Sequence, residues 1–259
     1  MTDSHLPETW SYNLVDSKFD FTNIGLRFRT SRPGPEEDFI RSFLAKLSSK
    51  SQPDLQLTFF KEPRLETGSP DLVGVIWHLP TAERWTENRA SLRRSDFRVM
   101  HQIAHSGNID TASIENLFGN RAAGSIERLE AAEMVTINHG VISSCPLSDL
   151  YAVRHIFAIE AKVSAWRMAL RQAFLNRWFA TSSHVLLPQM PASASMVSEA
   201  RDLGVRVWGP GATKLRLNLP STTSKPVSYA SWLFNEWAWK IWTQSSWAYA
   251  NSKHFLMDK

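Results

Sequence analysis

Two charged residues interrupt an apolar run in the second half of the chain, and they constrain the fold more than any other feature. Residues 156–163 are typical of a buried β-strand except for Glu160 and Lys162. Because side chains alternate along a strand, the two charges share one face and their apolar neighbours take the other. Charges in the middle of such a strand are costly unless they are paired. We therefore expect a cation and an anion to meet them in the folded chain.

A second apolar strand begins directly after an aspartate. Residues 55–59 alternate apolar and polar side chains, residues 67–70 form a turn containing Gly and Pro, and Asp71 precedes the apolar run 72–77. This order predicts a hairpin over 55–79 that leads into a buried strand. From the residues alone, Asp71 is either a site carboxylate or an aspartate that caps the turn.

Asp71 and Glu160 together would supply two hard oxygen ligands, which suit Mg²⁺ well and Zn²⁺ poorly. Lys162 beside such an ion could orient or deprotonate a water, while the ion neutralises a phosphate and lowers the pKa of the attacking water. The alternative for Glu160 and Lys162 is a charge pair on a solvated edge strand. The flanking Phe157 and Ile159 argue against an exposed strand.

A helix is expected to begin at Pro35, because proline and acidic residues favour the first helical turn. Apolar side chains then recur at helical spacing up to Leu47, and Glu36 falls near the middle of their stripe. A carboxylate that faces the core is costly unless it is paired or bound to a metal. Glu36 is thus a candidate site residue, with a helix-start carboxylate stabilised by the helix dipole as the alternative.

Residues 80–150 have a different character. Helices are expected over 97–104, 109–118 and 121–133, followed by two short strands joined by a tight turn at 138–140. Either Asp110 or Thr111 would cap the second helix. Three helices followed by a two-stranded wing resemble a winged helix-turn-helix.

Arginines are concentrated in this region. Five of them lie between residues 84 and 98: Arg84, Arg89, Arg93, Arg94 and Arg98. They are expected to contact DNA phosphates while the third helix probes the major groove. The predicted DNA-binding residues are Arg93, Arg94, Arg98, Arg121, Ser125 and Arg128. The alternative is an ordinary solvated helix face.

The remainder of the chain returns to alternating strands and helices. Helices are expected over 165–179 and 194–203, strands over 184–187 and 205–208, a strand plus loop over 213–228, and a Trp-rich helix or pair of turns over 229–250. The predicted fold is α/β, a mixed sheet flanked by helices. Residues 1–79 and 151–259 would form one discontinuous domain, with 80–150 inserted.

Pro70-Asp71 and Glu160-Ala161-Lys162 resemble the two halves of the motif of the PD-(D/E)XK nuclease superfamily, which has the restriction-endonuclease-like fold. The order helix, hairpin, strand, helix, strand in residues 35–79 and 151–208 is similar to the core of that family. Here residues 72–159 separate the two halves, a longer gap than is usual in the family, and the winged-helix-like segment fills it.

The resemblance implies a Mg²⁺-dependent DNA phosphodiesterase in which Mn²⁺ can substitute. Asp71, Glu160 and the carbonyl of Ala161 would hold the metal, and Lys162 would position the water. Glu36 matches a glutamate that the family often has on its first helix. Gln172, on the expected helix after the lysine strand, matches a glutamine of several branches that contacts substrate or orients the lysine. From the residues alone, Gln172 could equally be a surface residue.

Other function classes stay open. One is a non-catalytic DNA-binding regulator that uses a nuclease-like scaffold, since fold does not imply function. Another is an interaction protein that dimerises through its Trp-rich C-terminal region. Of the 11 tryptophans, five lie near the C-terminus: Trp232, Trp237, Trp239, Trp242 and Trp247. They do not share a helical face, which favours packing in the core or in a dimer.

Composition limits the compartment and the partners. The net charge of +4 permits an anionic partner without requiring one, and the single cysteine, Cys145, excludes an intrachain disulfide. The first residues lack the pattern of a signal peptide, and no apolar stretch is long enough to span a membrane. We expect a cytoplasmic protein without a membrane partner. Cutting both strands of a duplex would favour a homodimer, and control of a nuclease would favour a partner subunit.

Overall fold

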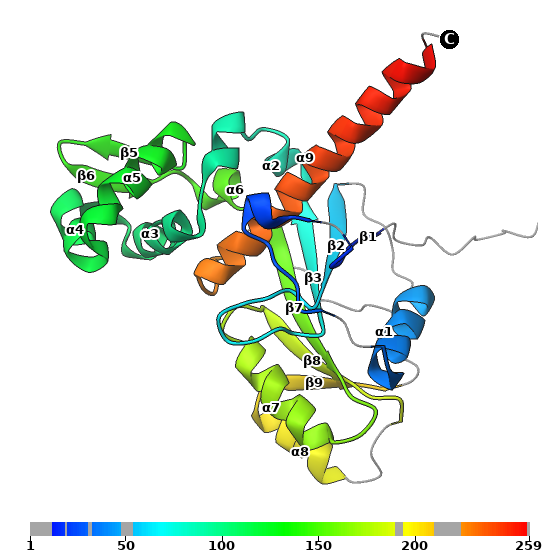
Figure 1. Cartoon of the computed structure of the whole chain (residues 1–259). Coiled ribbons are helices and arrows are strands. Elements are labelled where there is room, and N and C mark those ends of the chain that lie inside the picture. The colour runs from blue at the N-terminus through cyan, green and yellow to red at the C-terminus, as the bar shows by residue number, and fades with distance from the viewer. Residues whose placement is uncertain are drawn as a thin grey trace, which may run out of the picture.

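The computed structural model describes residues 12–18, 20–30, 33–47, 54–189, 194–209 and 224–257, with side chains for all of these except 194 and 245–257. A six-stranded mixed sheet in the order β1-β2-β3-β7-β8-β9 forms its centre (Figure 1). The strands are β1 (Tyr12–Val15), β2 (Leu55–Lys61), β3 (Leu72–His78), β7 (Val153–Ala161), β8 (Ser182–Leu186) and β9 (Val205–Trp208). The expected α/β class, a mixed sheet flanked by helices, is confirmed.

The direction of the strands changes at β7. β2, β3 and β7 pair antiparallel, whereas β7, β8 and β9 pair parallel, and β1 joins β2 in parallel. Near the centre of the antiparallel part, β3 approaches β7 very closely: a Cβ added at Gly74 would lie 2.1 Å from the ring of Phe157. Only glycine therefore fits at position 74 without displacing a fully buried aromatic side chain.

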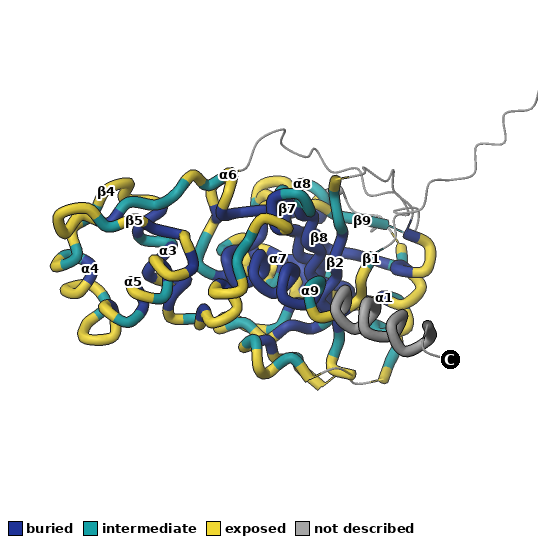
Figure 2. Tube along the Cα trace, turned by 90° about the horizontal axis from the view of Figure 1, so that it is seen from above, coloured by how far each residue is buried: buried dark blue, intermediate teal, exposed yellow. Residues whose placement is uncertain are grey.

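Helices cover both faces of the sheet. α1 (Pro35–Lys46) packs through Ile40 and Phe43 on the face that carries Phe59 and Phe157. The opposite face is covered by α7 (Trp166–Asn176), α8 (Ala194–Asp202) and the N-terminal part of α9 (Tyr229–Met257). Buried residues are concentrated between these layers (Figure 2).

The long connection between β3 and β7 folds into a second helical unit with its own small sheet. Its elements are α2 (Leu79–Ala82), η2 (Glu87–Ser91), α3 (Arg94–Ser106), β4 (Asn108–Asp110), α4 (Thr111–Phe118), η3 (Gly119–Arg121), α5 (Ala122–Ala131), β5 (Val135–Asn138), β6 (Val141–Ser144) and α6 (Leu147–Leu150). The small sheet has the order β4-β6-β5. The expected second helix starts later than predicted, because Ile109 pairs with Ile142 in this sheet. Asp110 caps that helix by accepting a hydrogen bond from Ser113 N at 2.7 Å.

The C-terminal helix joins this helical unit to the main sheet. Trp232, Trp237 and Trp239 are buried, as core packing of the Trp-rich segment predicts. One continuous apolar cluster contains these side chains together with Trp77 of β3 and Phe97 of α3. The helical unit therefore shares its core with the sheet through α9 instead of being connected by a flexible linker.

Polar contacts from α9 reinforce this junction. Arg89 of η2 forms an ion pair with Glu236 at 2.7 Å, and both side chains are almost completely buried. Asn235 accepts a hydrogen bond from Ala152 N at 2.9 Å, and Lys240 donates to Leu92 O at 3.3 Å. Each of these contacts reaches one of the two chain segments that connect the helical unit to the sheet.

Two sequence predictions fall partly or wholly outside the described residues. The strand plus loop expected over 213–228 overlaps them only at 224–228, and the side chain of Trp247 is not among them. Among the described residues, no helix has both the length and the apolarity needed to cross a membrane.

Candidate active site

The register of β3 and β7 brings two carboxylates together. Leu72 pairs with Ile159, so the antiparallel register continues to place Asp71 opposite Glu160. Both residues are buried, with 5% and 3% of their surface exposed. Asp71 Oδ2 also accepts a hydrogen bond from Ala161 N at 2.9 Å, which fixes the orientation of the carboxylate. Residues on either side of the long insertion thus meet at one end of the sheet.

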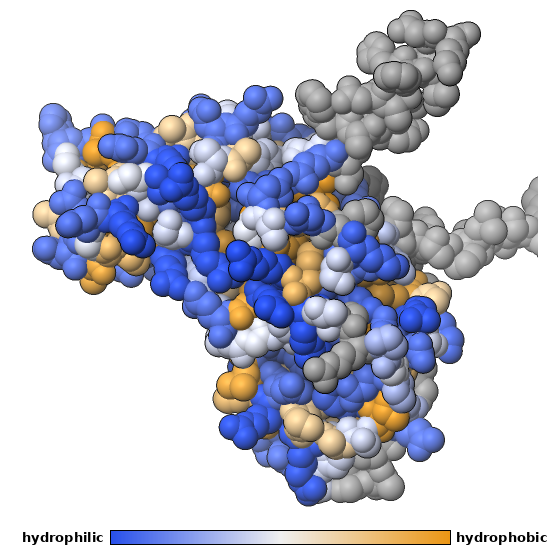
Figure 3. Space-filling model, viewed as in Figure 1, coloured by the Kyte–Doolittle hydropathy of each residue, from blue (hydrophilic) through white to orange (hydrophobic). Residues whose placement is uncertain are grey.

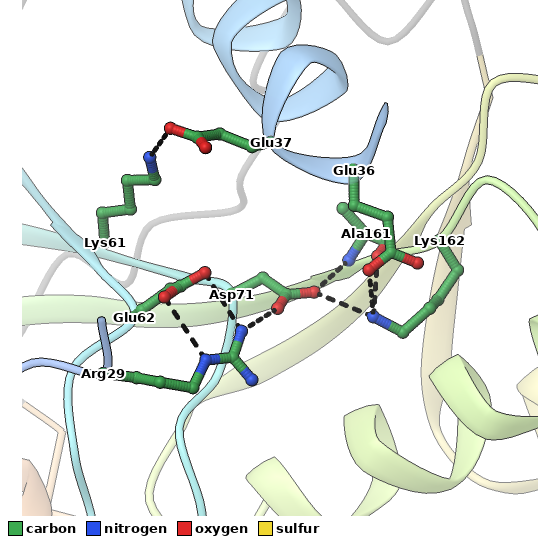
Figure 4. Close-up of polar contacts among 8 residues, drawn as sticks. All are labelled: Arg29, Glu36, Glu37, Lys61, Glu62, Asp71, Ala161 and Lys162. Carbon is green, nitrogen blue, oxygen red and sulfur yellow. Dashed lines mark hydrogen bonds and ion pairs between the residues drawn. The ribbon is translucent and has the colours of Figure 1, made fainter. Parts of the chain in front are cut away.

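Lys162, the residue directly after β7, completes this cluster. Its Nζ lies 3.1 Å from Glu36 Oε2, 3.5 Å from Asp71 Oδ2 and 3.1 Å from the carbonyl oxygen of Ala161 (Figure 4). Burial alone would lower the pKa of Lys162, but the carboxylates of Asp71 and Glu36 outweigh it and raise that pKa. Lys162 is therefore an ammonium group at neutral pH, suited to hold a water or a phosphate oxygen and not to remove a proton.

Glu160 has an incomplete set of partners. Its Oε1 accepts a hydrogen bond from Asn176 Nδ2 at 2.7 Å, whereas its buried Oε2 has no hydrogen-bond partner among the described residues. Burial and the negative charge of Asp71 raise the pKa of Glu160 to about 8. A buried, partnerless carboxylate oxygen beside a second carboxylate is an arrangement that a divalent cation would stabilise.

These groups fit an oxygen-ligated cation. Asp71, Glu160 and the carbonyl of Ala161 would hold Mg²⁺, which prefers few protein oxygens and several waters. Within the described part of the chain, no three His, Cys, Asp or Glu residues form a metal-binding group. Lys162 Nζ contacts two of the three ligand groups, so its ammonium and a metal ion would share the same oxygens.

The raised pKa of Glu160 predicts a pH-dependent stability. The folded-state pKa, about 8, lies above the ordinary value of 4.5, so the folded chain retains a proton that the unfolded chain releases. The contribution of Glu160 to stability is therefore fully present below pH 4.5 and is lost as the pH rises through 8. In EDTA, Glu160→Gln should raise the Tm by several degrees at pH 9 and by much less at pH 5, because glutamine still accepts from Asn176. Parallel Tm curves for the two proteins across this range would contradict the assignment.

The structure adds three residues that the sequence analysis did not identify. Arg29 donates to both oxygens of Glu62, at 3.3 and 3.0 Å, and to Asp71 Oδ1 at 3.2 Å. Asn176 contacts Glu160 from α7. The hairpin register was the available signal for Glu62, since Lys61 pairs with Leu72 and Glu62 then lies opposite Asp71. No local pattern marks Arg29, whose partners lie on another segment.

Gln172 lies on α7, one helical turn before Asn176. It is half-buried, and its Oε1 is a buried acceptor without a hydrogen-bond partner among the described residues. Among the described residues, Gln172 makes no hydrogen bond with the carboxylates or with Lys162, so a role in orienting Lys162 stays a prediction.

A cleft of about 740 Å³ opens beside these side chains. It reaches Asp71 from the surface. Its walls come from α1, from the segment before it and from the residues around the β2–β3 hairpin. The lining residues are Arg29, Thr30, Glu36, Glu37, Ile40, Glu62, Arg64 and Asp71.

Two of the predicted DNA-contacting residues of α5 are engaged inside the helical unit. Ser125 is buried and its hydroxyl lies 2.7 Å from Asp96 Oδ1. Arg128 donates to both oxygens of Asp96, at 2.8 and 2.6 Å. Asp96 is fully buried on α3, so these contacts hold α3 and α5 together. The prediction that Ser125 faces a DNA groove is wrong, because its position in the α3–α5 interface closes it to an external ligand.

The other predicted arginines are nearer the surface. Arg93 and Arg121 are exposed. Arg98 forms an ion pair with Glu66 of the β2–β3 loop, and Arg94 lies 3.9 Å from the same carboxylate. Figure 3 shows strongly hydrophilic side chains gathered where the helical unit meets the sheet. Arg89, in contrast, is buried against Glu236 and is unavailable to DNA.

The helical unit leaves the sheet at the end opposite to the carboxylates. Trp77 pairs with Val153 at that end, and Asp71 and Glu160 lie at the other. Trp77 lies six residue positions after Asp71, which corresponds to about 20 Å of strand. The β2–β3 loop, at the Asp71 end of β3, contacts the helical unit through the ion pair of Glu66 with Arg98 of α3.

Comparisons with protein-family models, with curated proteins and with solved structures find no match. Functional inference for this chain therefore depends on the chemistry of its own residues.

Proposed function

We propose that this protein is a metal-dependent DNA endonuclease with a PD-(D/E)XK type of site. The observation that carries the proposal is the meeting of Asp71, Glu160 and Lys162 at one end of the sheet. Burial beside the Asp71 carboxylate raises the pKa of Glu160, and an ionised pair of this kind destabilises the fold unless a cation neutralises it.

Each residue has a distinct task in this proposal. Asp71 and Glu160, with the Ala161 carbonyl, hold Mg²⁺ or Mn²⁺. The bound ion neutralises the phosphodiester and lowers the pKa of the attacking water. Lys162 orients that water or a phosphate oxygen as an ammonium group, and Glu36 holds Lys162 in place at 3.1 Å. Asn176 keeps Glu160 directed toward Asp71.

The fold supports the same interpretation. The order α1, β2, β3, β7, α7, β8 agrees with the helix, hairpin, strand, helix, strand order of the restriction-endonuclease-like fold. The order α3, β4, α4, α5, β5, β6 resembles that of a winged helix, and we propose residues 80–150 as a DNA-binding insertion of this kind. Its exposed Arg93 and Arg121 are the leading phosphate contacts, with Arg94 and Arg98 beside Glu66.

Cleavage of supercoiled and single-stranded DNA tests the function directly. Wild type should cut in Mg²⁺ or Mn²⁺ and not in EDTA, and Asp71→Asn and Glu160→Gln should abolish cutting while remaining folded. Size exclusion should show a dimer if both strands are cut in one encounter. Tight, salt-sensitive DNA binding without cleavage in any metal would favour the non-catalytic regulator. In that case a pull-down for a partner subunit, repeated with added partner, would separate a regulator from a nuclease that needs activation.

A further inference from the structure

The cleft beside Asp71 contains two arginines that are not ligands of the proposed metal site, Arg29 and Arg64. Four carboxylates line the same cleft. Because the carboxylates outnumber the arginines, the cleft would repel DNA unless the acids are neutralised from within the protein. The partners of each charged group decide what this surface offers to a ligand.

Every carboxylate of the cleft already has a cation. Glu37 pairs with Lys61 at 2.8 Å, and Glu62 is held by Arg29 at 3.0 Å. Glu36 and Asp71 share Lys162, and Asp71 also contacts Arg29. Lys61, Arg29 and Lys162 thus offset most of the negative charge of the four carboxylates before a ligand arrives.

Both arginines have guanidinium N–H groups without a hydrogen-bond partner among the described residues. Arg64 is exposed and its guanidinium forms no ion pair or hydrogen bond with any described residue. Arg29 uses Nε and Nη2 for Glu62 and Asp71, and Figure 4 draws no contact from its remaining nitrogen. Arg64 therefore offers its whole guanidinium group, which can bind phosphate oxygens in a bidentate manner, whereas Arg29 keeps only the N–H donors of Nη1 for a ligand.

The backbone holds these arginines in fixed relation. Phe28 forms a β-bridge with Pro63, Arg29 N donates to Glu62 O at 2.9 Å, and Arg64 N donates to Arg27 O at 2.8 Å. Glu62 is buried and has φ +53°, a left-handed conformation that is costly for a residue with a side chain. Such strain is typical of functional positions, and here it places the carboxylate that anchors Arg29.

We propose that Arg29 and Arg64 form a phosphate-binding subsite for the DNA strand, next to the phosphodiester that is cut. This inference rests on the proposed nuclease function. Arg29 also donates a hydrogen bond to Asp71, so a phosphate bound to Arg29 would lie next to the proposed metal ligands. Arg64 supplies affinity without touching the reacting atoms.

A pair of matched variants tests the subsite. Arg64→Gln removes the free guanidinium, and Arg27→Gln removes an exposed arginine that lies opposite Arg64 on the adjacent segment but does not line the cleft. Binding of a fluorescent DNA oligonucleotide is measured by anisotropy in EDTA over a range of salt, and cleavage kinetics are measured in Mg²⁺. Arg64→Gln should weaken binding about tenfold, lower the salt slope by about one and raise KM at constant kcat. Arg27→Gln should leave all of these close to wild type.

Arg29 requires a conservative change, since removing its charge would leave Glu62 buried and unpaired. Arg29→Lys keeps the positive charge but loses the planar guanidinium that donates several hydrogen bonds at once. It should lower kcat and the affinity for DNA, while the Tm stays near that of wild type. Equal effects of Arg64→Gln and Arg27→Gln would overturn the subsite, because they would reflect general surface charge. If wild type cuts no DNA in any metal, with or without an added partner, the nuclease function fails, and the anisotropy comparison still decides whether Arg64 binds a phosphate.

Discussion

Lys162→Met should reduce DNA cleavage by about 10²–10⁴-fold, the range expected for loss of a group that acts on the proton or charge of the reaction. Methionine retains the length of the side chain and removes the ammonium that contacts Asp71 and Glu36. The Asp71 carboxylate and the Ala161 carbonyl then lose a competitor for their oxygens, so Mg²⁺ affinity should be unchanged or higher. Single-turnover cleavage of a supercoiled plasmid and calorimetric titration with Mg²⁺ would measure the two effects separately.

Lys61→Met is a matched control for this variant. Lys61 also pairs with a glutamate of α1, because its Nζ lies 2.8 Å from Glu37, and it is similarly shielded from solvent. The control should cut DNA at a rate within about threefold of wild type. A Lys162→Met protein that cleaves as fast as the control would remove Lys162 from the mechanism, whatever the metal affinity.

Of the variants proposed here, Arg89→Met should lower the free energy of unfolding the most. Glu236 accepts hydrogen bonds from Arg89 Nε and Nη2 between 2.7 and 3.1 Å, and Arg89 also donates to Leu150 O. Without the guanidinium, a carboxylate that is 1% exposed loses its counter-charge. Breaking a buried pair from one side costs about 3–5 kcal/mol, which lowers the Tm by roughly 10 °C in a chain of this size. Urea denaturation monitored by tryptophan fluorescence would measure the loss.

Two further variants make this prediction specific. Arg84→Met removes an arginine from the exposed pair with Asp149, whose side chains are 62% and 52% exposed, and should cost no more than about 1 kcal/mol. The double variant Arg89→Met/Glu236→Leu should regain most of the lost stability, since an apolar pair of similar volume can replace a buried ion pair. A double variant no more stable than Arg89→Met would show that shape, and not the uncompensated charge, sets the cost.

The local patterns were sufficient for the central strands and the first helix. The apolar run 72–77 lies within β3, and the stripe that begins at Pro35 became α1. Residues 156–161 of the predicted strand 156–163 lie in β7, which ends before Lys162. The candidate side chains Asp71, Glu160 and Lys162 could be identified because charge in an apolar strand is costly unless it meets a partner. That argument requires only the side-chain period of a strand, which is a property of the local backbone.

The roles of the arginines could not be read in the same way. Arg89 was grouped with the predicted DNA-binding arginines, yet its partner Glu236 lies 147 residues further along the chain. Ser125 was predicted to face DNA, yet the packing of α3 on α5 directs it to Asp96. A helical pattern defines which side chains share a face, and the tertiary packing alone decides what that face contacts.

The sequence by itself determined which charged residues lie within apolar segments. The spacing of apolar side chains depends on the local backbone, so it can be recognised in each strand and helix separately. Only the tertiary structure decided which charges meet. The β3–β7 register placed Asp71 opposite Glu160 across the whole inserted segment, and the bridge of Phe28 to Pro63 placed Arg29 and Glu62 beside them. The physical reason is that a charge on one segment restricts its partner's type but not its position, which chain topology and strand register set.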